Sequence, residues 1–490
     1  HKAIRRQRQM CIRDSNNFIW RFAQTEGNYN FSSGSRGKGN LSSEANPYFL
    51  FPQIYNFRYN IFSSEWPVAN RVIELYLQKK SENGGWERQI NGISNNEKAV
   101  LLLEKRTFKE LLVDMELRNL QNNIVGQEAS RLFARAEINM GVEAFRDSLY
   151  SLLKRNTFLN IKFENMLDTL GEISRTDIRS LLGEWEKTTP LPFYSLGEPT
   201  LTKITNKGGE EFFVLKMLIS NNSDYDGIIH MDIRKDGWWY QPLEDPRAKT
   251  KIEMPAHTSK EFVSVWEDQI RNVEINTMVS GNLPNIISQD INNVKQERNK
   301  IVKDSIYILP ESSFDLPGEI IVDNEDSTLF ILSAPPIVGL LPKWLDEVEE
   351  TPFKYSGISW WRPPLQWTAT TNDRYYGKYI RSAFVIKSGD GSQTATWKVP
   401  VPEVGQYDLY YHVFKDDELR WNNNLQGEYH FKVKYGSEVE DAYVNLRKAN
   451  EGWEQLGSYY FDSDTIRVVL TDECKLRSVT ADAVKIVKRY

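Results

Sequence analysis

The chain reads GWEQLGSYYF over residues 452–461, IRVVL over 466–470 and VTADAVKIV over 479–487. In the second run, Ile466, Val468 and Leu470 are apolar at every other position, which predicts a strand with one buried face. The segment Ala481-Asp482-Ala483-Val484 then leads into a last apolar strand. Three β-type runs separated by turn residues indicate that the chain ends in a β-rich domain.

Three further motifs precede these runs: YYG at 375–377, TATW at 394–397 and GQYDLY at 405–410. Together, in this order, they resemble the golvesin or xanthan lyase C-terminal-like domain over residues 355–490. The resemblance implies a jelly-roll-like β-sandwich of the kind found at the end of bacterial envelope and secreted enzymes. It therefore implies an extracytoplasmic bacterial setting. It does not imply lyase chemistry, because only the accessory domain is resembled.

Length and composition narrow the classes of function. The 490 residues allow two to four domains. A net charge of −6, from 61 basic and 67 acidic residues, leaves no dominant basic patch, so no nucleic-acid partner is expected. No apolar run is long enough to span a bilayer. A membrane tether upstream of these residues remains an alternative.

Cysteine and histidine content argues against a metal site in this chain. Cys11 and Cys474 are too few for a disulfide framework or a cysteine zinc site. None of the five histidines stands in an H-E-x-x-H motif. We therefore expect no cofactor and no metal here.

The first residues do not read as folded protein. Residues 1–15, with RRQRQMCIRDS at 5–15, have no helical or strand period and resemble translated adapter sequence. Residues 16–60 are aromatic and irregular and are expected to be the remnant of a truncated domain. On this interpretation the natural protein starts further upstream.

Residues 61–195 are predicted to be helical. Apolar spacing and capping residues predict helices from Pro67, from Ser94 through LLLEKRTFKELL, over 122–140, 142–154 and 162–170, and after a cap at 174–177. Trp185 and the Pro190-Leu191-Pro192 turn close the region.

The order of motifs in this region carries a second resemblance. GVEAF (141–145), NTF (156–158), FENML (163–167) and DIRSLL (177–182) are followed by Trp185. This order resembles the helical C-terminal lobe of aminopeptidase-N-like (gluzincin) zinc metallopeptidases over about 65–195. The zinc ligands of that family lie upstream and have no counterpart here, so the resemblance allows zinc only in a full-length parent.

The same resemblance singles out Asn123. The family carries an oxyanion-stabilising tyrosine three residues before the glycine that opens the helix corresponding to 126–140. If Gly126 is that glycine, Asn123 occupies the position as a degenerate transition-state residue. The charged residues Glu97, Glu104, Glu128 and Asp177 are interpreted as helix caps and solvated faces rather than catalytic carboxylates.

Two further segments precede the terminal domain. Strand-like runs at 211–220, 228–234, 251–254, 261–265 and 272–277 predict an immunoglobulin-like β-sandwich over 196–285. Residues 286–354 are expected to be a connector, helical or loose over 290–303, with a short strand at 319–322 before an acidic turn.

The aromatic residues of the terminal domain are predicted to have two roles, packing in the core and contact with a ligand. We expect Trp397, Tyr407 and Trp453 in the core, because they belong to the motifs. Trp360, Trp361 and Trp421 lie outside the motifs and are the candidate glycan contacts. Asp482 is expected to be a structural hydrogen-bond acceptor rather than a catalytic acid.

The sequence thus predicts a multidomain fold, α then β. We expect a non-catalytic C-terminal fragment of a bacterial envelope or secreted metallopeptidase-like protein, ending in a ligand- or polymer-binding sandwich. The alternative is a glycan- or cell-wall-binding module, or a structural module of an envelope assembly, whose parent has no peptidase activity. A polysaccharide or cell-wall polymer is the expected partner in either case.

Overall fold

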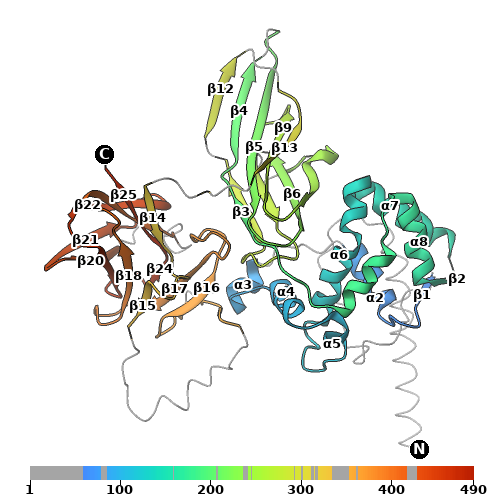
Figure 1. Cartoon of the computed structure of the whole chain (residues 1–490), viewed down its shortest axis with the longest axis horizontal. Helices are drawn as coiled ribbons and strands as arrows, with labels where there is room; N and C mark the ends of the chain where they lie inside the picture. Colours follow the sequence, from blue (N-terminus) through green and yellow to red (C-terminus); the bar gives the residue numbers. More distant parts are fainter. Residues whose placement is uncertain are drawn as a thin grey trace, which may run out of the picture. The chain divides into compact units, whose positions relative to one another are not determined.

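A computed structural model describes most of the chain from residue 59 onward (Figure 1). The described residues are 59–78, 85–157, 159–205, 208–235, 241–243, 245–291, 293–298, 302–310, 314, 318–333, 353–359, 362–415 and 427–489. They divide into two compact units, the first within residues up to 80, 99–190 and 249–252. The adapter-like residues 1–15, and the remnant expected up to residue 60 except for its last two residues, lie outside the described set.

Helices make up most of the first unit. They are α2 (Ala69–Leu77), most of α4 (Asn95–Lys105), α5 (Phe108–Leu112), α6 (Gln121–Met140), α7 (Val142–Arg155), α8 (Phe163–Ser174) and the 3-10 helix η2 (Arg179–Glu186). A short parallel pair joins β1 (Tyr59–Phe62) to β2 (Leu159–Lys162). The sequence did not predict this pair.

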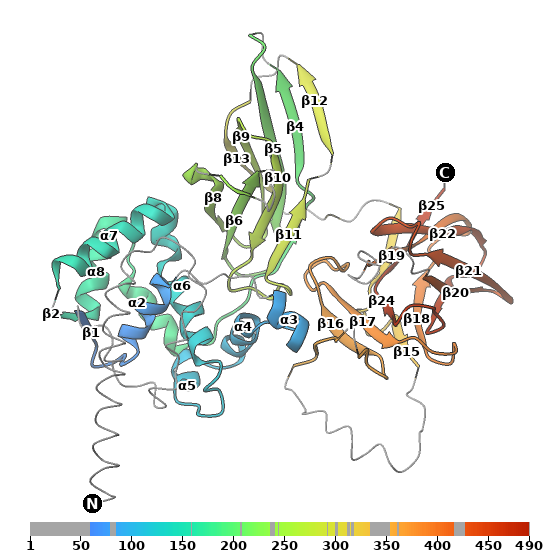
Figure 2. The same cartoon turned by 180° about the vertical axis from the view of Figure 1, so that it is seen from behind.

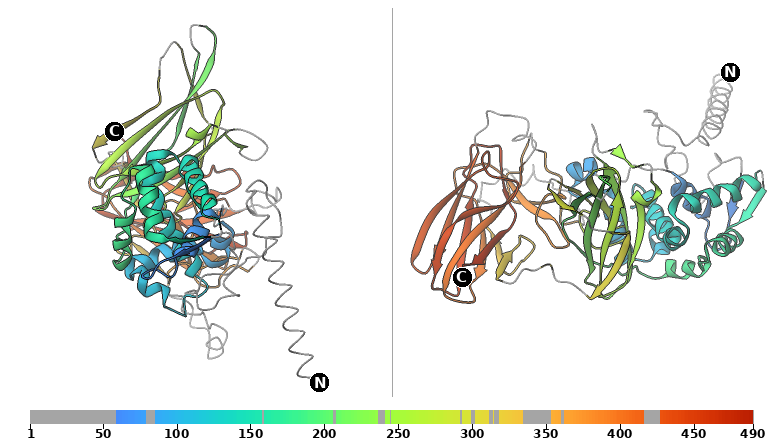
Figure 3. Two further views of the ribbon diagram at one scale, coloured as in Figure 1. Left: turned by 90° about the vertical axis from the view of Figure 1, so that its right-hand side faces the viewer. Right: turned by 90° about the horizontal axis from the view of Figure 1, so that it is seen from above.

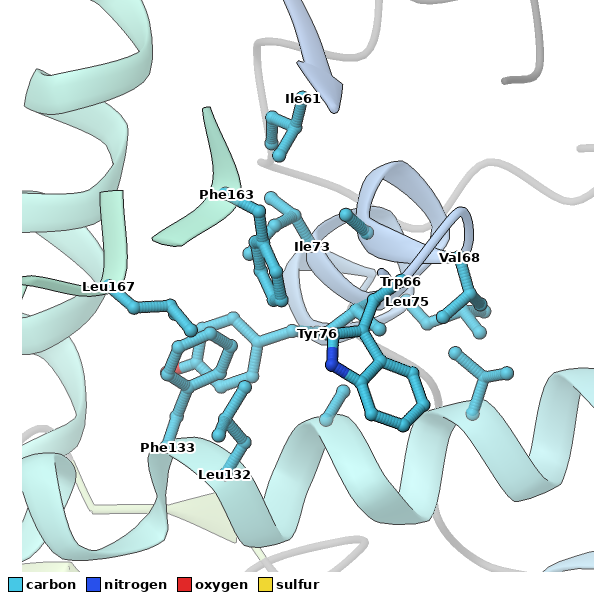
Figure 4. Packing of buried hydrophobic residues seen from close by; sticks show 14 of the residues in the cluster. Ile61, Trp66, Val68, Ile73, Leu75, Tyr76, Leu132, Phe133, Phe163 and Leu167 are labelled. Carbon is cyan, nitrogen blue, oxygen red and sulfur yellow. The ribbon is translucent and has the colours of Figure 1, made fainter. Parts of the chain in front are cut away.

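Aromatic and aliphatic side chains from these helices form one core (Figure 4). Trp66 and Trp185 meet edge to face with ring centroids 5.0 Å apart, and Phe108 lies 4.9 Å from Trp185. Around Tyr76, Phe133 packs at 4.7 Å. Edge-to-face and tilted aromatic pairs of this kind add stabilisation beyond the apolar area that they bury.

One predicted helix is two helices. The helix expected from Ser94 through residue 112 ends at Lys105, and α5 starts after Thr107. The Thr107 side chain accepts a hydrogen bond from the Glu110 amide, and the Glu110 carboxylate accepts one from the Thr107 amide. This capping box starts a new helix where apolar spacing alone suggested continuity.

The second unit contains a first set of β-sheets. Its strands are β3 (Tyr194–Leu196), β4 (Thr200–Thr205), β5 (Glu211–Asn221), β6 (Gly227–Lys235), β7 (Gln241–Pro242), β8 (Lys249–Met254, partly in the first unit), β9 (Thr258–Trp266), β10 (Ile270–Asn276), β11 (Ile286–Asp290), β12 (Val294–Arg298) and β13 (Ser305–Pro310). One sheet runs β11-β10-β6-β7, and the other runs β12-β4-β5-β9-β13. The five predicted strands are all present, whereas the immunoglobulin-like topology stays a prediction.

The expected connector begins with strands instead. Over 290–303 we expected a helical or loose segment, but β12 pairs in parallel with β4, and β13 pairs antiparallel with β9. β12 is exposed at nearly every position, so it has no alternation of apolar and polar residues that would reveal it. Main-chain hydrogen bonds to a sheet edge, rather than side-chain burial, give it its conformation.

The chain ends in a second set of sheets (Figures 2 and 3, from yellow through orange to red). Its strands are β14 (Glu319–Val322), β15 (Phe330–Leu332), β16 (Thr368–Thr371), β17 (Ser382–Lys387), β18 (Thr394–Pro400), β19 (Gly405–Val413), β20 (Glu428–Tyr435), β21 (Glu438–Asn445), β22 (Gly452–Phe461), β23 (Thr465–Thr471), β24 (Ser478–Ala481) and β25 (Val484–Lys488). The sheets run β14-β25-β19-β22, β15-β18-β23-β20-β21 and β16-β17-β24.

The two larger terminal sheets bury a shared core. Tyr411 of β19 packs against Phe431 of β20 with centroids 4.9 Å apart, and 6.2 Å from Trp397 of β18. Among the described residues, the buried members of this core all lie between 322 and 486. The predicted strand at 319–322 is present as β14, but it belongs to this sandwich rather than to a connector.

Candidate functional site

Strand β19 alternates between the core and an outer face. Tyr407, Leu409, Tyr411 and Val413 are buried, whereas the positions between them are partly exposed. The period of two along a strand sends these intervening side chains to the opposite side of the sheet. The outward side of the β14-β25-β19-β22 sheet therefore carries the polar and aromatic residues of β19.

Aromatic and cationic residues gather on this side. We define the aromatic face as Tyr376, Tyr410, His412, Trp453 and Lys485. In the strand register His412 lies opposite Trp453, and Tyr410 lies opposite Lys485. Tyr376, from the loop before β17, joins them across the sheet surface.

Ring contacts hold the aromatic face together. The Trp453 centroid lies 5.1 Å from that of Tyr376 and 5.2 Å from that of His412. The Lys485 Nζ lies 4.8 Å from the Trp453 centroid and 5.3 Å from the Tyr410 centroid, within cation–π range. Lys485 also pairs with Glu319 at 3.1 Å, which fixes the position of its charge.

A buried carboxylate orients His412. Asp482 has no exposed surface, and its Oδ2 lies 2.8 Å from His412 Nδ1. The Tyr376 amide donates to the same carboxylate at 3.1 and 3.2 Å. Burial raises the pKa of Asp482, and the contact with His412 opposes that rise. Because Asp482 engages Nδ1, the imidazole ring is fixed with its other nitrogen directed away from this carboxylate.

The segment around Asp482 also serves the core. The Tyr411 hydroxyl donates to the Thr480 carbonyl at 2.5 Å, and the Trp397 indole donates to the Asp482 carbonyl at 3.3 Å. Buried aromatic groups with a polar atom require such partners. The expectation that Asp482 is a structural acceptor is confirmed, and the short TADAV segment links the core to the aromatic face.

A polar cluster continues the aromatic face along β19 and β22. Asp408 accepts hydrogen bonds from Gln455 at 3.1 Å and from Ser458, and pairs with Arg489 at 2.8 Å. Burial raises the pKa of Asp408, but the bonds from Ser458 and Arg489 outweigh burial and lower it overall. Tyr460, on the same face by register, is 58% exposed.

The predicted core aromatics divide differently from expectation. Trp397 and Tyr407 are buried, as predicted. The core prediction for Trp453 is wrong, because the residue is half-buried and its ring contacts residues of the outer face. In register it lies opposite His412, which points away from the core. Trp360, Trp361 and Trp421 lie outside the described residues, so their predicted role as glycan contacts stays a prediction.

Three of the four carboxylates of the helical region behave as predicted. Glu97 forms a capping box with Ser94 and pairs with Arg88 at 2.9 Å. Asp177 accepts the Ser180 amide near the start of η2. Glu104 is exposed on α4.

Glu128 is the exception, because it is neither a cap nor solvated. It is 1% exposed, and its Oε2 has no hydrogen-bond partner among the described residues. The nearest cation is the Arg131 guanidinium, 3.4 Å from its other oxygen. Burial raises the pKa of Glu128, although Arg131 opposes the rise.

The role of Asn123 as a degenerate transition-state residue stays a prediction. Helix α6 begins at Gln121, so Asn123 lies in its first turn and Gly126 lies inside the helix rather than opening it. The Asn123 amide donates to the Leu120 carbonyl at 2.9 Å. Within the described residues, no group of three or more His, Cys, Asp or Glu side chains could hold a metal ion.

His412, Tyr410, Asp408 and Lys485 were missed at the level of sequence. The signal was present in β19, where Asp408, Tyr410 and His412 alternate with three buried apolar residues. The alternation along β25 alone could not assign Lys485 to the aromatic face, because its neighbours there belong to two other strands, β19 and β22. Among the described helices, none is both long and apolar enough for a membrane crossing.

Residues 363–488 match the family model of the Golvesin C-terminal domain. The match confirms the golvesin-like resemblance for the terminal sandwich, and the matched range contains all five residues of the aromatic face. The chain has no match among curated protein sequences. The resemblance of residues 65–195 to an aminopeptidase-N-like lobe stays a prediction.

Solved structures give only distant likenesses. Bacteroides uniformis beta-glucuronidase is 12% identical over 61% of this chain and 30% of its own chain, with a TM-score of 0.18. The carbohydrate-binding module TmCBM61, in complex with beta-1,4-galactotriose, is 14% identical over 35% of this chain and 86% of its own, with a TM-score of 0.13. This chain thus spans about a third of the length of the glucuronidase, and TM-scores this low do not establish a shared fold.

Proposed function

We propose that the golvesin-like domain binds a polysaccharide or cell-wall polymer through the aromatic face, outside the bacterial cytoplasm. The observation that carries the proposal is the placement of Trp453. It lies on the solvent side of a sheet, among Tyr376, His412 and Lys485, rather than in the core.

The chemistry of the face suits a sugar polymer. The C–H faces of a pyranose pack against aromatic rings, while its hydroxyl groups require donors and acceptors nearby. Tyr410, Trp453 and the exposed Tyr460 supply rings along one sheet. Asp408 and Gln455 supply an ionised acceptor and an amide between them. The ladder of strands places these groups in a row, which suits an extended chain.

The test is retention of the whole chain in native gels that contain one polysaccharide each, over a panel of neutral and acidic polymers. We expect at least one polymer to retard the wild type. Trp453→Ala should weaken that binding by about tenfold or more, because one aromatic contact contributes about 1 kcal/mol beyond its buried area.

Tyr443→Ala is the matched control. Tyr443 is 56% exposed on β21 of the opposite sheet, where it stacks on His430. The substitution therefore removes a surface aromatic ring of the same domain, but on another face. Equal loss in both variants, or no retention of the wild type by any polymer, would count against the proposal. A loss restricted to Trp360→Ala, Trp361→Ala or Trp421→Ala would move the binding site to those residues.

We also propose that residues 65–195 are an aminopeptidase-like lobe that has no catalytic activity by itself. Zinc would be bound only in a full-length parent that supplies the ligands. Its test is separate from that of polymer binding. Zinc-dependent hydrolysis of peptides by this chain alone would contradict it.

A further inference from the structure

Strand β13 is an apolar strand at the edge of its sheet. Four consecutive large side chains are exposed: Ile306 by 47%, Tyr307 by 52%, Ile308 by 73% and Leu309 by 39%. Since successive side chains of a strand point to opposite faces, both faces of β13 are apolar and open among the described residues. Single exposed apolar residues are ordinary, but a run of four on one strand indicates a contact surface.

The main chain of β13 is also available on one side. It pairs with β9 from Ser305 to Pro310 and ends the sheet order β12-β4-β5-β9-β13. Among the described strands, β9 is its only neighbour. An edge of this kind offers a row of N–H and C=O groups to another strand.

The two edges of this sheet differ in charge. β12, at the far edge, reads VKQER and exposes Lys295, Glu297 and Arg298. Charges on an edge strand oppose pairing with another chain. The run SIYILP of β13 has no charge and lacks this protection. Pairing of β13 with β12 of another copy would set apolar residues against charges and would leave free edges at both ends.

The centre of β13 is symmetric about Tyr307, which has an isoleucine on each side, whereas Ser305 would face Leu309. In antiparallel pairing of two copies centred on this residue, Ile306 of each copy lies beside Ile308 of the other on one face. On the opposite face, Tyr307 lies beside Tyr307. Over residues 305–309 no charged side chain enters the contact, and apolar side chains meet on both faces. A two-fold contact requires this kind of self-complementary surface.

We propose that β13 is the interface between two copies of this chain, which pair antiparallel through this strand about a two-fold axis. The interface joins the two β12-β4-β5-β9-β13 sheets into one continuous sheet. The aromatic face takes no part in it, so this proposal and polymer binding can fail independently.

The first test is the mass of the whole chain in solution by light scattering over a concentration series. The wild type is expected to reach twice the chain mass of 57.1 kDa as concentration rises. Ile308→Lys should stay at the chain mass, because it places a charge in the apolar contact. Gln296→Lys, on the exposed edge of β12, should behave as the wild type.

Far-UV circular dichroism and thermal unfolding of each variant show whether it is folded. Ile308 is mostly exposed, so Ile308→Lys should leave both unchanged. A wild type that stays at the chain mass at every concentration would overturn the proposal. So would a folded Ile308→Lys variant that still doubles its mass.

A cross-link tests the register. Directly opposed residues of an antiparallel pair have Cβ atoms about 4.5–5.5 Å apart, which a disulfide bridges after a small adjustment. Tyr307→Cys should therefore form a covalent dimer under mild oxidation, above the level of the wild type, which contains the same two native cysteines. Cross-linking by Gln296→Cys, but not by Tyr307→Cys, would contradict the two-fold pairing of β13.

Discussion

Asp482 is a single residue on which two parts of the terminal sandwich depend. It is fully buried and accepts from the Tyr376 amide and His412. We predict that Asp482→Ala lowers the free energy of unfolding by about 2–4 kcal/mol, because buried donors lose their acceptor. Urea unfolding monitored by tryptophan fluorescence measures the change. Asp462→Ala, at an exposed position, should change stability by less than about 0.5 kcal/mol.

Glu128 makes stability depend on pH. Burial raises its pKa, so the folded state holds the proton to a higher pH than the unfolded state. The contribution of Glu128 to the free energy of unfolding therefore falls as pH rises from the unfolded pKa of about 4.3 through the raised folded value. We predict that Glu128→Gln becomes progressively more stable than the wild type as the pH rises from acidic to neutral.

Thermal unfolding of both chains at several pH values measures this difference. Glu104→Gln, on the exposed side of α4, should show none. A stability difference between Glu128→Gln and the wild type that does not change with pH would show that the folded and unfolded pKa values of Glu128 are equal.

Trp453 shows where residue-level prediction from sequence reached its limit. Trp397, Tyr407 and Trp453 all belong to the motifs, and the first two are core residues. Trp453 has the same motif status but lies opposite His412 on the outer face. The register of β22 against β19, which includes a bulge near Leu456, decides this, and register is a property of the pair rather than of either strand.

At the scale of elements, the cap at Thr107 divides α4 from α5. We predict that Thr107→Ala lowers the free energy of unfolding by about 1 kcal/mol, since it removes the hydroxyl that accepts from the Glu110 amide. Thr107→Ser should retain most of the stability, because the serine hydroxyl can accept the same bond. Equal stability of the two variants would contradict a capping role.

Elements with a clear local signal were predicted well. The helices at 122–140 and 142–154 appear as α6 and α7 within a residue at each end, because apolar spacing and Gly141 mark them locally. By contrast, β1 pairs with β2 across about a hundred residues, and β12 has no buried face. No local pattern indicates a partner that distant, so these three strands were missed.

At the scale of the molecule, the terminal sandwich is larger than its motifs indicated. Its expected start was residue 355, but β14 and β15 supply Val322 and Phe330 to its core. We predict that a fragment of residues 318–490 unfolds cooperatively by itself, because the buried residues of this core all come from that range.

A fragment of residues 355–490 is the matched comparison. It lacks β14, which pairs with β25, and β15, which pairs with β18. The apolar residues that these two strands cover become exposed. We expect it to melt at a lower temperature and to bind a hydrophobic dye. Equal melting temperatures would show that β14 and β15 do not stabilise the sandwich.

The position of β25 has a consequence for biosynthesis. This strand lies between β14 and β19, in the interior of its sheet, yet residues 484–488 leave the ribosome after all other strands of the domain. Before β25 is made, β14 and β19 have no strand between them. His412 likewise has no carboxylate partner before Asp482 is made. A chain released before residue 484 would have open strand edges, the kind of product that cellular proteases remove. The sandwich thereby completes its folding only after its last strand has been made.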